Sequence, residues 1–182
     1  MRAHATGAPL LAPRKRRPDM RSRRGCVFGI TGHQNLSEGV RRIVKERIDD
    51  IVARVDESTG YSCLAAGADQ VFAESLLEHG GSLVAVVPAH DYELTFDSSE
   101  GRLAFESLLN HAQEIIRMPF ENASEAAYWA AGKEVAQRCD TLIAVWDGEP
   151  SGGLGGTADV VKYCREKGKD IIIVWPDGVR RS

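Results

Sequence analysis

The chain has 182 residues, of which 43% are hydrophobic, 7% aromatic and 27% charged, and its formal net charge at pH 7 is -3. This size and composition are typical of one soluble globular domain. The longest apolar runs, 141–146 and 171–175, are far shorter than the ~20 residues of a membrane-spanning helix, which excludes a transmembrane segment.

Positive charge is concentrated at the N-terminus. Residues 1–24 contain eight of the 23 Lys and Arg residues but one of the 26 Asp and Glu residues, so the remainder has 15 basic and 25 acidic residues. A body with a net charge near -10 argues against a nucleic-acid-binding surface. The first segment has three prolines and no apolar periodicity, so it is predicted to be a disordered basic tail.

That tail has two interpretations. It is either an electrostatic anchor for nucleic acid or a membrane surface, or a solvated extension without a role in the chemistry of the domain. It lacks the apolar stretch of a secretory signal, and Met20 is an alternative start of the chain. The folded domain is then expected at residues 25–178, with a short C-terminal tail at 179–182.

The four cysteines are widely separated in sequence and form neither a Cys-x-x-Cys pair nor a Cys/His cluster with metal-ligand spacing. Most lie in or beside apolar runs, which favours buried, reduced thiols over disulfides. We therefore expect a cytoplasmic protein with no metal site and no cofactor.

The first half of the chain alternates between strand and helix patterns. An apolar run at 26–31 predicts a strand, and Ser37 is a suitable N-cap for the amphipathic helix that continues to Val55. The pattern repeats with the segments that follow: a strand at 62–66, a helix at 69–79, and a strand at 83–87 that Pro88 ends.

The second half continues this alternation: a helix at 101–111, a strand at 114–118, a helix at 123–138, a strand at 141–146, a helix at 157–167 and a strand at 171–175. Continuously apolar strands between helices indicate a parallel sheet that is covered on both faces. The predicted fold class is α/β, a Rossmann-like doubly wound, mainly parallel sheet of five to six strands with helices on both faces. Ligands of such sheets bind at the carboxyl ends of the strands.

The most informative loop, 147–157 (DGEPSGGLGGT), joins the most apolar strand to an amphipathic helix. Its glycines allow close backbone approach, and the amides of a helix N-terminus attract anions. The loop is predicted to hold a phosphate or a ribose; the alternative is a flexible surface loop. It matches neither the Walker pattern nor a dinucleotide fingerprint. The predicted ligand contacts are Gly152, Gly153, Gly155, Gly156 and Thr157.

The loops after the first two strands should lie at the same edge of the sheet. Gly29 and Gly32 would allow close approach of a ligand, and Thr31 and His33 could hydrogen-bond to it, unless they form an ordinary polar turn.

The second loop contains Gly67 and Asp69. Asp69 is either a ribose-hydroxyl acceptor or a carboxylate that stabilises a helix N-terminus. After the third strand, residues 88–93 form a further polar set.

Two carboxylates, Asp147 and Glu149, follow the fifth strand and are the best-placed candidates for general acid/base chemistry.

Four segments taken in order, GITGHQNL, LAAGADQVFAE, AVVPAHDYE and CDTLIAVWDGEPSGGLGGTADVV, resemble the SLOG superfamily, which includes the Smf/DNA-processing proteins and the Lonely Guy phosphoribohydrolases. The resemblance covers nearly all of 26–175 and implies a Rossmann-like fold with a nucleotide-ligand pocket. In the Lonely Guy enzymes, a PGGxGTxxE motif carries a catalytic Glu, and an Arg-Lys pair lies on the preceding helix. Those enzymes cleave the N-glycosidic bond of nucleoside monophosphates.

This chain departs from that motif. Ser151 replaces the Pro, an additional glycine enlarges the turn, and Val160 stands at the Glu position, with Asp159 one residue earlier. On the preceding helix Lys133 is kept, but a glycine precedes it. The resemblance therefore implies that Lys133 contributes to binding while the hydrolytic residues have changed.

The leading hypothesis is a domain that binds or senses a nucleotide or nucleotide-derived small molecule. The alternative is a nucleoside 5'-monophosphate N-glycosidase in which Asp147, Glu149 or Asp159 stabilises the transition state or activates water. A third hypothesis, DNA binding of the Smf type, requires a basic face that the body lacks. The sequence leaves the oligomeric state open, and the resemblance adds a homodimer as one option, because related pockets are often completed at a dimer interface.

Overall fold

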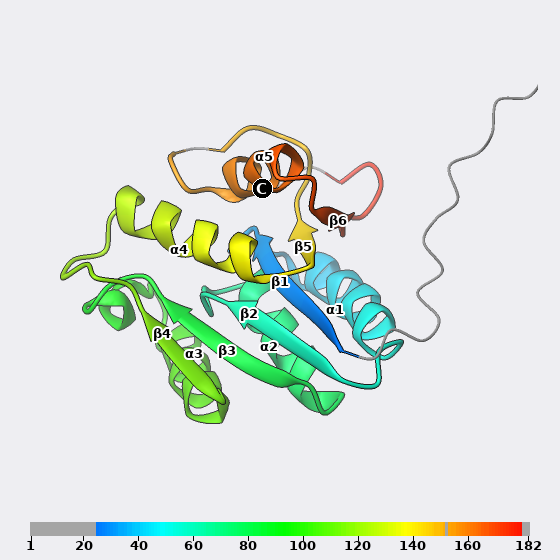
Figure 1. Ribbon diagram of the computed structural model, residues 1–182, viewed down its shortest axis with the longest axis horizontal. Coiled ribbons are helices and arrows are strands. Elements are labelled where there is room, and N and C mark those ends of the chain that lie inside the picture. Colours follow the sequence, from blue (N-terminus) through cyan, green and yellow to red (C-terminus); the bar gives the residue numbers. More distant parts are fainter. Residues whose placement is uncertain (1–24, 152, 180–182) are drawn as a thin grey trace, which may run out of the picture.

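A six-stranded parallel sheet runs through the centre of the computed structural model, which describes residues 25–151 and 153–179 (Figure 1). The strand order is β4-β3-β2-β1-β5-β6, and every neighbouring pair is parallel. The strands are β1 (Cys26–Gly32), β2 (Ser58–Ser62), β3 (Ser82–Val87), β4 (Glu114–Arg117), β5 (Thr141–Val145) and β6 (Asp170–Ile173). The predicted fold class is confirmed. The predicted tail at 1–24 and residues 180–182 lie outside the described residues.

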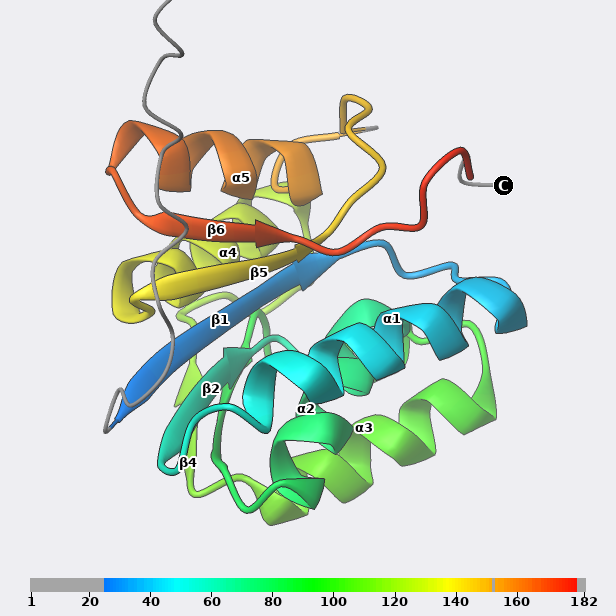
Figure 2. The same cartoon turned by 90° about the vertical axis from the view of Figure 1, so that its right-hand side faces the viewer.

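Helices cover the sheet on both faces (Figure 2). They are α1 (Glu38–Val52), α2 (Ala68–Glu78), α3 (Ser99–His111), α4 (Glu125–Arg138) and α5 (Thr157–Glu166), with a short 3-10 helix η1 (Tyr92–Thr95). The larger apolar core lies between the sheet and α1, α2 and α3, and two smaller clusters lie on the side of α4 and α5. Ser37 caps α1 as predicted, since its hydroxyl accepts a hydrogen bond from the Val40 amide.

The second strand is displaced from its predicted position. It occupies Ser58–Ser62 rather than 62–66, and its sequence, STGYS, has few apolar side chains. Small residues are required here because α2 packs closely on this strand: a Cβ on Gly60 would lie 2.5 Å from Leu76 Cδ2 and 2.6 Å from Phe72 Cζ. The apolar residues after Ser62 instead form the loop that leads into α2.

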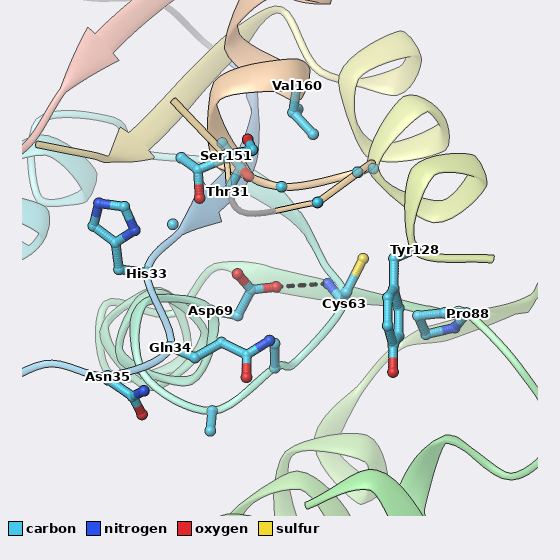
Figure 3. A pocket seen from close by; sticks show the side chains of 18 of the residues that line it. Thr31, His33, Gln34, Asn35, Cys63, Asp69, Pro88, Tyr128, Ser151 and Val160 are labelled. Atoms are coloured by element: carbon cyan, nitrogen blue, oxygen red, sulfur yellow. Dashed lines mark hydrogen bonds between the residues drawn. The ribbon is translucent and has the colours of Figure 1, made fainter. Parts of the chain in front are cut away.

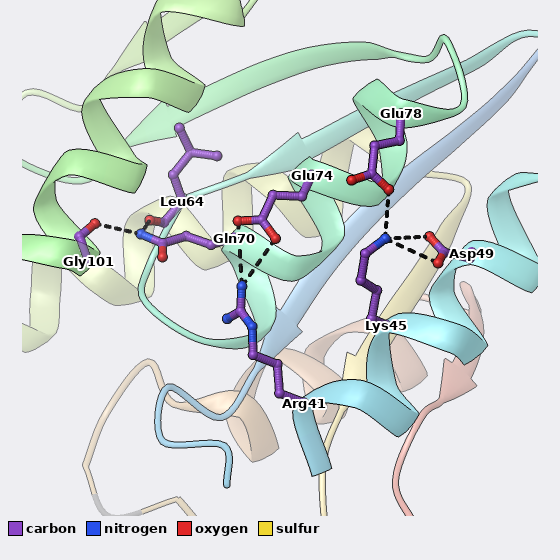
Figure 4. Close-up of polar contacts among 8 residues, drawn as sticks. All are labelled: Arg41, Lys45, Asp49, Leu64, Gln70, Glu74, Glu78 and Gly101. Carbon is purple, nitrogen blue, oxygen red and sulfur yellow. Dashed lines mark hydrogen bonds and ion pairs between the residues drawn. The ribbon is translucent and has the colours of Figure 1, made fainter. Parts of the chain in front are cut away.

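Polar contacts hold the three helices of the larger layer together (Figure 4). Arg41 of α1 pairs with Glu74 of α2 at 3.1 Å, and Lys45 pairs with Glu78 at 2.7 Å. The Gln70 side-chain amide donates to the backbone carbonyl of Gly101 at 2.8 Å, which connects α2 to the start of α3. These contacts fix the helices whose N-terminal ends approach the carboxyl edge of the sheet.

Candidate functional site

A cavity of about 800 Å³ opens at the carboxyl edge of the sheet (Figure 3). Its walls come from the loops after β1, β2, β3 and β5, from the segment after η1, and from the first turns of α4 and α5. The loops therefore meet as parallel topology predicts, because the carboxyl ends of all strands lie at one edge.

The glycine-rich turn before α5 is held by its own polar side chains. The Ser151 hydroxyl accepts a hydrogen bond from the Ala158 amide at 3.1 Å, and the Asp159 carboxylate accepts one from the Gly155 amide at 3.1 Å. Among the described residues, no hydrogen bond is formed by the amides of Gly156 and Thr157, which begin α5 beside the cavity. This helix N-terminus can therefore bind an anion.

The same turn packs directly against α4. Gly155 has φ +85°, and a Cβ at this position would lie 2.6 Å from the backbone nitrogen of Trp129. Glu125, the first residue of α4, places a carboxylate oxygen so close to Gly153 that a Cβ there would collide with it. The first two turns of α4 thus form the part of the wall beside the glycine-rich turn and the N-terminus of α5.

The loop after β1 is fixed to the loop after β5 through a histidine. His33 Nε2 lies 3.0 Å from Asp147 Oδ1 and 3.2 Å from the Asp147 backbone nitrogen. A neutral Nε2 accepts the amide proton, whereas a protonated Nε2 donates to the carboxylate. The edge of the His33 ring also contacts Trp175, with ring centroids 5.0 Å apart. These contacts orient His33, which lines the cavity, while Asp147 lies behind it.

Asp69 is a buried carboxyl group at the start of α2 that also lines the cavity. It accepts hydrogen bonds from the Ser62 hydroxyl and the Cys63 amide, both at 3.0 Å. Burial raises the pKa of Asp69 to about 7, although these hydrogen bonds lower it. Burial and then the Asp69 charge raise the pKa of the Cys63 thiol well above its ordinary value, so this thiol is a poor nucleophile at neutral pH.

Aromatic residues form the end of the cavity away from the glycine-rich turn. Tyr92 contacts Phe96, Phe105 and Tyr128 edge to face, with ring centroids 5.5, 5.6 and 6.2 Å apart. The rings of Tyr92, Phe96 and Tyr128 line the cavity together with Pro88, which lies beside Tyr128 in Figure 3. Burial raises the pKa of the Tyr92 hydroxyl well above its usual range. This end of the cavity presents flat apolar surface next to polar groups.

Most of the predicted ligand contacts lie together on the cavity wall. These are Thr31, Gly32, His33, Asp69, Gly153, Gly155, Gly156 and Thr157, joined by the predicted acid/base candidate Glu149. Gly152 lies outside the described residues.

Five predicted residues do not line this cavity. Gly29 lies under α4, where a Cβ would stand 2.9 Å from Cys139 Sγ, and Gly67 has φ +82° and packs on the backbone carbonyl of Gln34. Lys133 lies over the Trp129 ring at 5.3 Å. The remaining two, Asp147 and Asp159, make the contacts described above.

Sequence reasoning missed several residues of the wall. Glu125 and Tyr128 belong to α4, and Phe96 follows η1. Ser124, whose hydroxyl accepts a hydrogen bond from the Ala127 amide, marks the start of α4. That cap could have shown that Glu125 lies at a helix N-terminus near the carboxyl edge. No comparable signal marks Phe96.

Comparison with known proteins finds similarity at the level of structure. No protein-family model and no curated protein matches the sequence. DNA processing protein A (DprA) from Streptococcus pneumoniae superimposes with a TM-score of 0.62 at 17% identity, over 81% of this chain and 50% of that one. The likeness is one of fold, a parallel α/β sheet of the Rossmann-like kind. This chain spans about half the length of that DNA-processing protein.

Two further structures share this fold. The molybdenum cofactor carrier protein of Chlamydomonas reinhardtii gives a TM-score of 0.53 at 16% identity, over 82% of this chain and 76% of that one. The structural genomics target TM1055 gives 0.53 at 13% identity, over 80% and 72%. At these identities the likeness establishes the fold alone.

Two further observations concern membrane-spanning helices and metal sites. Within residues 25–151 and 153–179, none of the helices combines the length and the hydrophobicity needed to cross a bilayer. In that same part of the chain, no three His, Cys, Asp or Glu side chains are grouped so that they could hold a metal ion.

Proposed function

We propose that this chain binds or senses a nucleotide or nucleotide-derived small molecule in the cavity at the carboxyl edge of the sheet. The observation that carries the proposal is the pairing of two surfaces across one cavity of about 800 Å³. One is the glycine-rich turn with the N-terminus of α5, and the other is the aromatic end around Tyr92 and Tyr128. This volume lies within the usual range for small-molecule sites.

The two ends suit the two parts of such a ligand. A phosphate would accept hydrogen bonds from the amides of Gly156 and Thr157 and be favoured by the α5 dipole. A base would pack against Tyr128, Phe96 and Pro88. Thr31 and the neighbouring polar residues of the β1 loop would contact the sugar between them.

Binding is favoured over cleavage because the residue at the catalytic Glu position is apolar and the two nearby aspartates are engaged in hydrogen bonds within the protein. Val160 is buried, and its Cγ2 would lie 2.8 Å from a Cβ on Gly132. The Asp159 carboxylate accepts a hydrogen bond from the Gly155 amide. The Asp147 carboxylate contacts His33 Nε2 and accepts a hydrogen bond from the Glu149 amide. Neither aspartate lines the cavity.

Native mass spectrometry of the purified protein tests the proposal by identifying a ligand that is carried through purification. Calorimetry with nucleosides, mononucleotides, dinucleotides and cyclic nucleotides would then measure affinity. Tyr128→Ala should weaken binding roughly tenfold through lost stacking. Tyr163→Ala is the control, since Tyr163 contacts Trp129 and Gln137 instead of the cavity. Absence of any bound or titratable nucleotide would reject the proposal.

The alternative, a nucleoside-monophosphate N-glycosidase, is supported by Glu149, which lines the cavity beside the glycine-rich turn. Its backbone carbonyl accepts a hydrogen bond from the Trp146 indole at 2.7 Å, so its position is fixed at the backbone. Chromatography of nucleotide mixtures would detect released base. Activity that Glu149→Gln abolishes would favour hydrolysis, and activity that survives Glu149→Gln and Asp159→Asn would exclude these two residues.

Two coarser proposals accompany this function. A cytoplasmic location is proposed on the four free cysteines of the described chain, three of which are buried. A homodimer is proposed from the SLOG resemblance, and light scattering would measure the mass in solution.

A further inference from the structure

The side chains that line the cavity include several carboxylates. Within the described residues, the acidic ones are Asp69, Asp97, Glu125 and Glu149, and no Lys or Arg is among them. Positive potential for an anionic ligand therefore comes from backbone amides at helix N-termini, each equivalent to roughly half an elementary charge.

Nearby cations are engaged elsewhere. Lys133 of α4 lies over the Trp129 ring at 5.3 Å, and Arg165 of α5 lies over the Trp146 ring at 5.6 Å. Arg41 pairs with Glu74 on the far side of the β1 loop. Each would have to leave its contact to neutralise a phosphate in the cavity.

Glu125 is a carboxylate of the cavity wall that lies against the glycine-rich turn. It is the first residue of α4, and its side chain contacts Gly153 in the turn that leads into α5. A phosphate monoester carries a charge of about -1.5 to -2 at neutral pH, which already exceeds what one helix N-terminus offsets. Each further phosphate adds negative charge to a cavity that also contains Glu125.

We propose that Glu125 is a specificity-determining residue that makes the cavity discriminate against ligands with two or more linked phosphates, in favour of ligands with one phosphate or none. This rests on the proposed function. Carboxylate and phosphate repel each other across a few ångströms in a partly enclosed cavity, where charge interactions are stronger than in bulk water.

Calorimetry with a nucleoside and its mono-, di- and triphosphates, repeated for each of the four bases, tests this on the full chain without divalent cations. The wild type should bind the diphosphate roughly tenfold more weakly than the monophosphate. Glu125→Gln should reduce that ratio to about twofold, and Glu125→Lys should reverse it. Because salt screens such repulsion, the wild-type ratio should also fall between 50 and 500 mM salt, roughly to that of Glu125→Gln.

Glu38→Gln is a matched control. Glu38 is the first residue of α1, follows a capping serine just as Glu125 does, and lies outside the cavity wall. The substitution makes the same change in charge and in the helix dipole interaction, so it should leave the ratio at its wild-type value. Circular dichroism would confirm that each variant is folded.

The outcomes separate the two proposals. Tighter binding of diphosphates than monophosphates by the wild type, or an equal effect of Glu38→Gln and Glu125→Gln, would overturn the role of Glu125 while leaving nucleotide binding intact. Failure of every nucleoside and nucleotide to bind would overturn the proposed function, and the discrimination proposed for Glu125 with it.

Discussion

Asp69 makes stability sensitive to pH in the neutral range. Its pKa is raised in the folded protein to about 7 from an ordinary value of 3.8, because it is buried. The folded state therefore binds this proton more tightly than the unfolded state. The contribution of the Asp69 proton to stability is full below about pH 4 and is lost as pH rises to about 7.

The variant Asp69→Asn tests this at a single residue. The Asn oxygen can still accept hydrogen bonds from Ser62 and Cys63, but it carries no titrating proton. Urea unfolding at pH 5 and pH 8 should show wild-type stability falling relative to the variant, by up to about 3 kcal/mol. Asp140→Asn, at an exposed position, should follow the wild type. Parallel pH profiles for the wild type and Asp69→Asn would contradict the prediction.

Among the described residues of the turn between β5 and α5, two glycines have positive φ, and they differ in what surrounds them. Gly155 has φ +85° and lies against the backbone of α4, whereas Gly148 has φ +91° and nothing within 4 Å of an added Cβ. Gly148→Ala should cost about 1 kcal/mol for the backbone conformation alone. Gly155→Ala should cost about 3 kcal/mol, because the methyl group also collides with Trp129 N.

Urea unfolding of the two variants measures this difference directly. Similar midpoints for both would show that α4 moves away from the turn without cost. The comparison also affects how binding is tested. A bulky residue at Gly155 would displace α4 as well as fill the phosphate position, so loss of binding in such a variant would not locate the ligand.

The elements of this fold differ in how well local sequence specifies them. The strand β5, with sequence TLIAV, is buried throughout and lies within one residue of its predicted range, because a short, continuously apolar run between two helices is typical of a buried parallel strand. The strand β2 departs from its predicted range because its position depends on Phe72 and Leu76 of α2 pressing on Gly60, a tertiary contact that no local pattern reveals.

Local sequence also specifies the residues of the candidate site only in part. The loops that form it follow from parallel topology, but the direction of each side chain does not. Gly29 and Gly32 belong to one strand, yet a Cβ on Gly29 would face α4, whereas Gly32 lines the cavity. Likewise Asp147 and Glu149 are two residues apart, and only Glu149 lines the wall. Such differences arise from packing between segments that are distant in sequence.

At the scale of the whole molecule, the net negative charge of the folded body argues against DNA binding. DNA processing protein A from Streptococcus pneumoniae shares only its fold with this chain. Residues 25–182 of this chain carry 15 Lys and Arg against 25 Asp and Glu. Since phosphate contacts by basic side chains dominate affinity for DNA, a body of this charge should repel the DNA backbone.

Fluorescence anisotropy with a labelled single-stranded oligonucleotide should therefore detect no binding at 150 mM salt. Any binding at 20 mM salt is expected to come from the eight basic residues at 1–24, to weaken steeply as salt rises, and to disappear when residues 14–17 (RKRR) are replaced by glutamine. The nucleotide affinity of that variant should remain at its wild-type value, because the cavity is formed by other segments. Binding that persists at 150 mM salt in the glutamine variant would instead require a DNA site on the folded body, despite its negative charge.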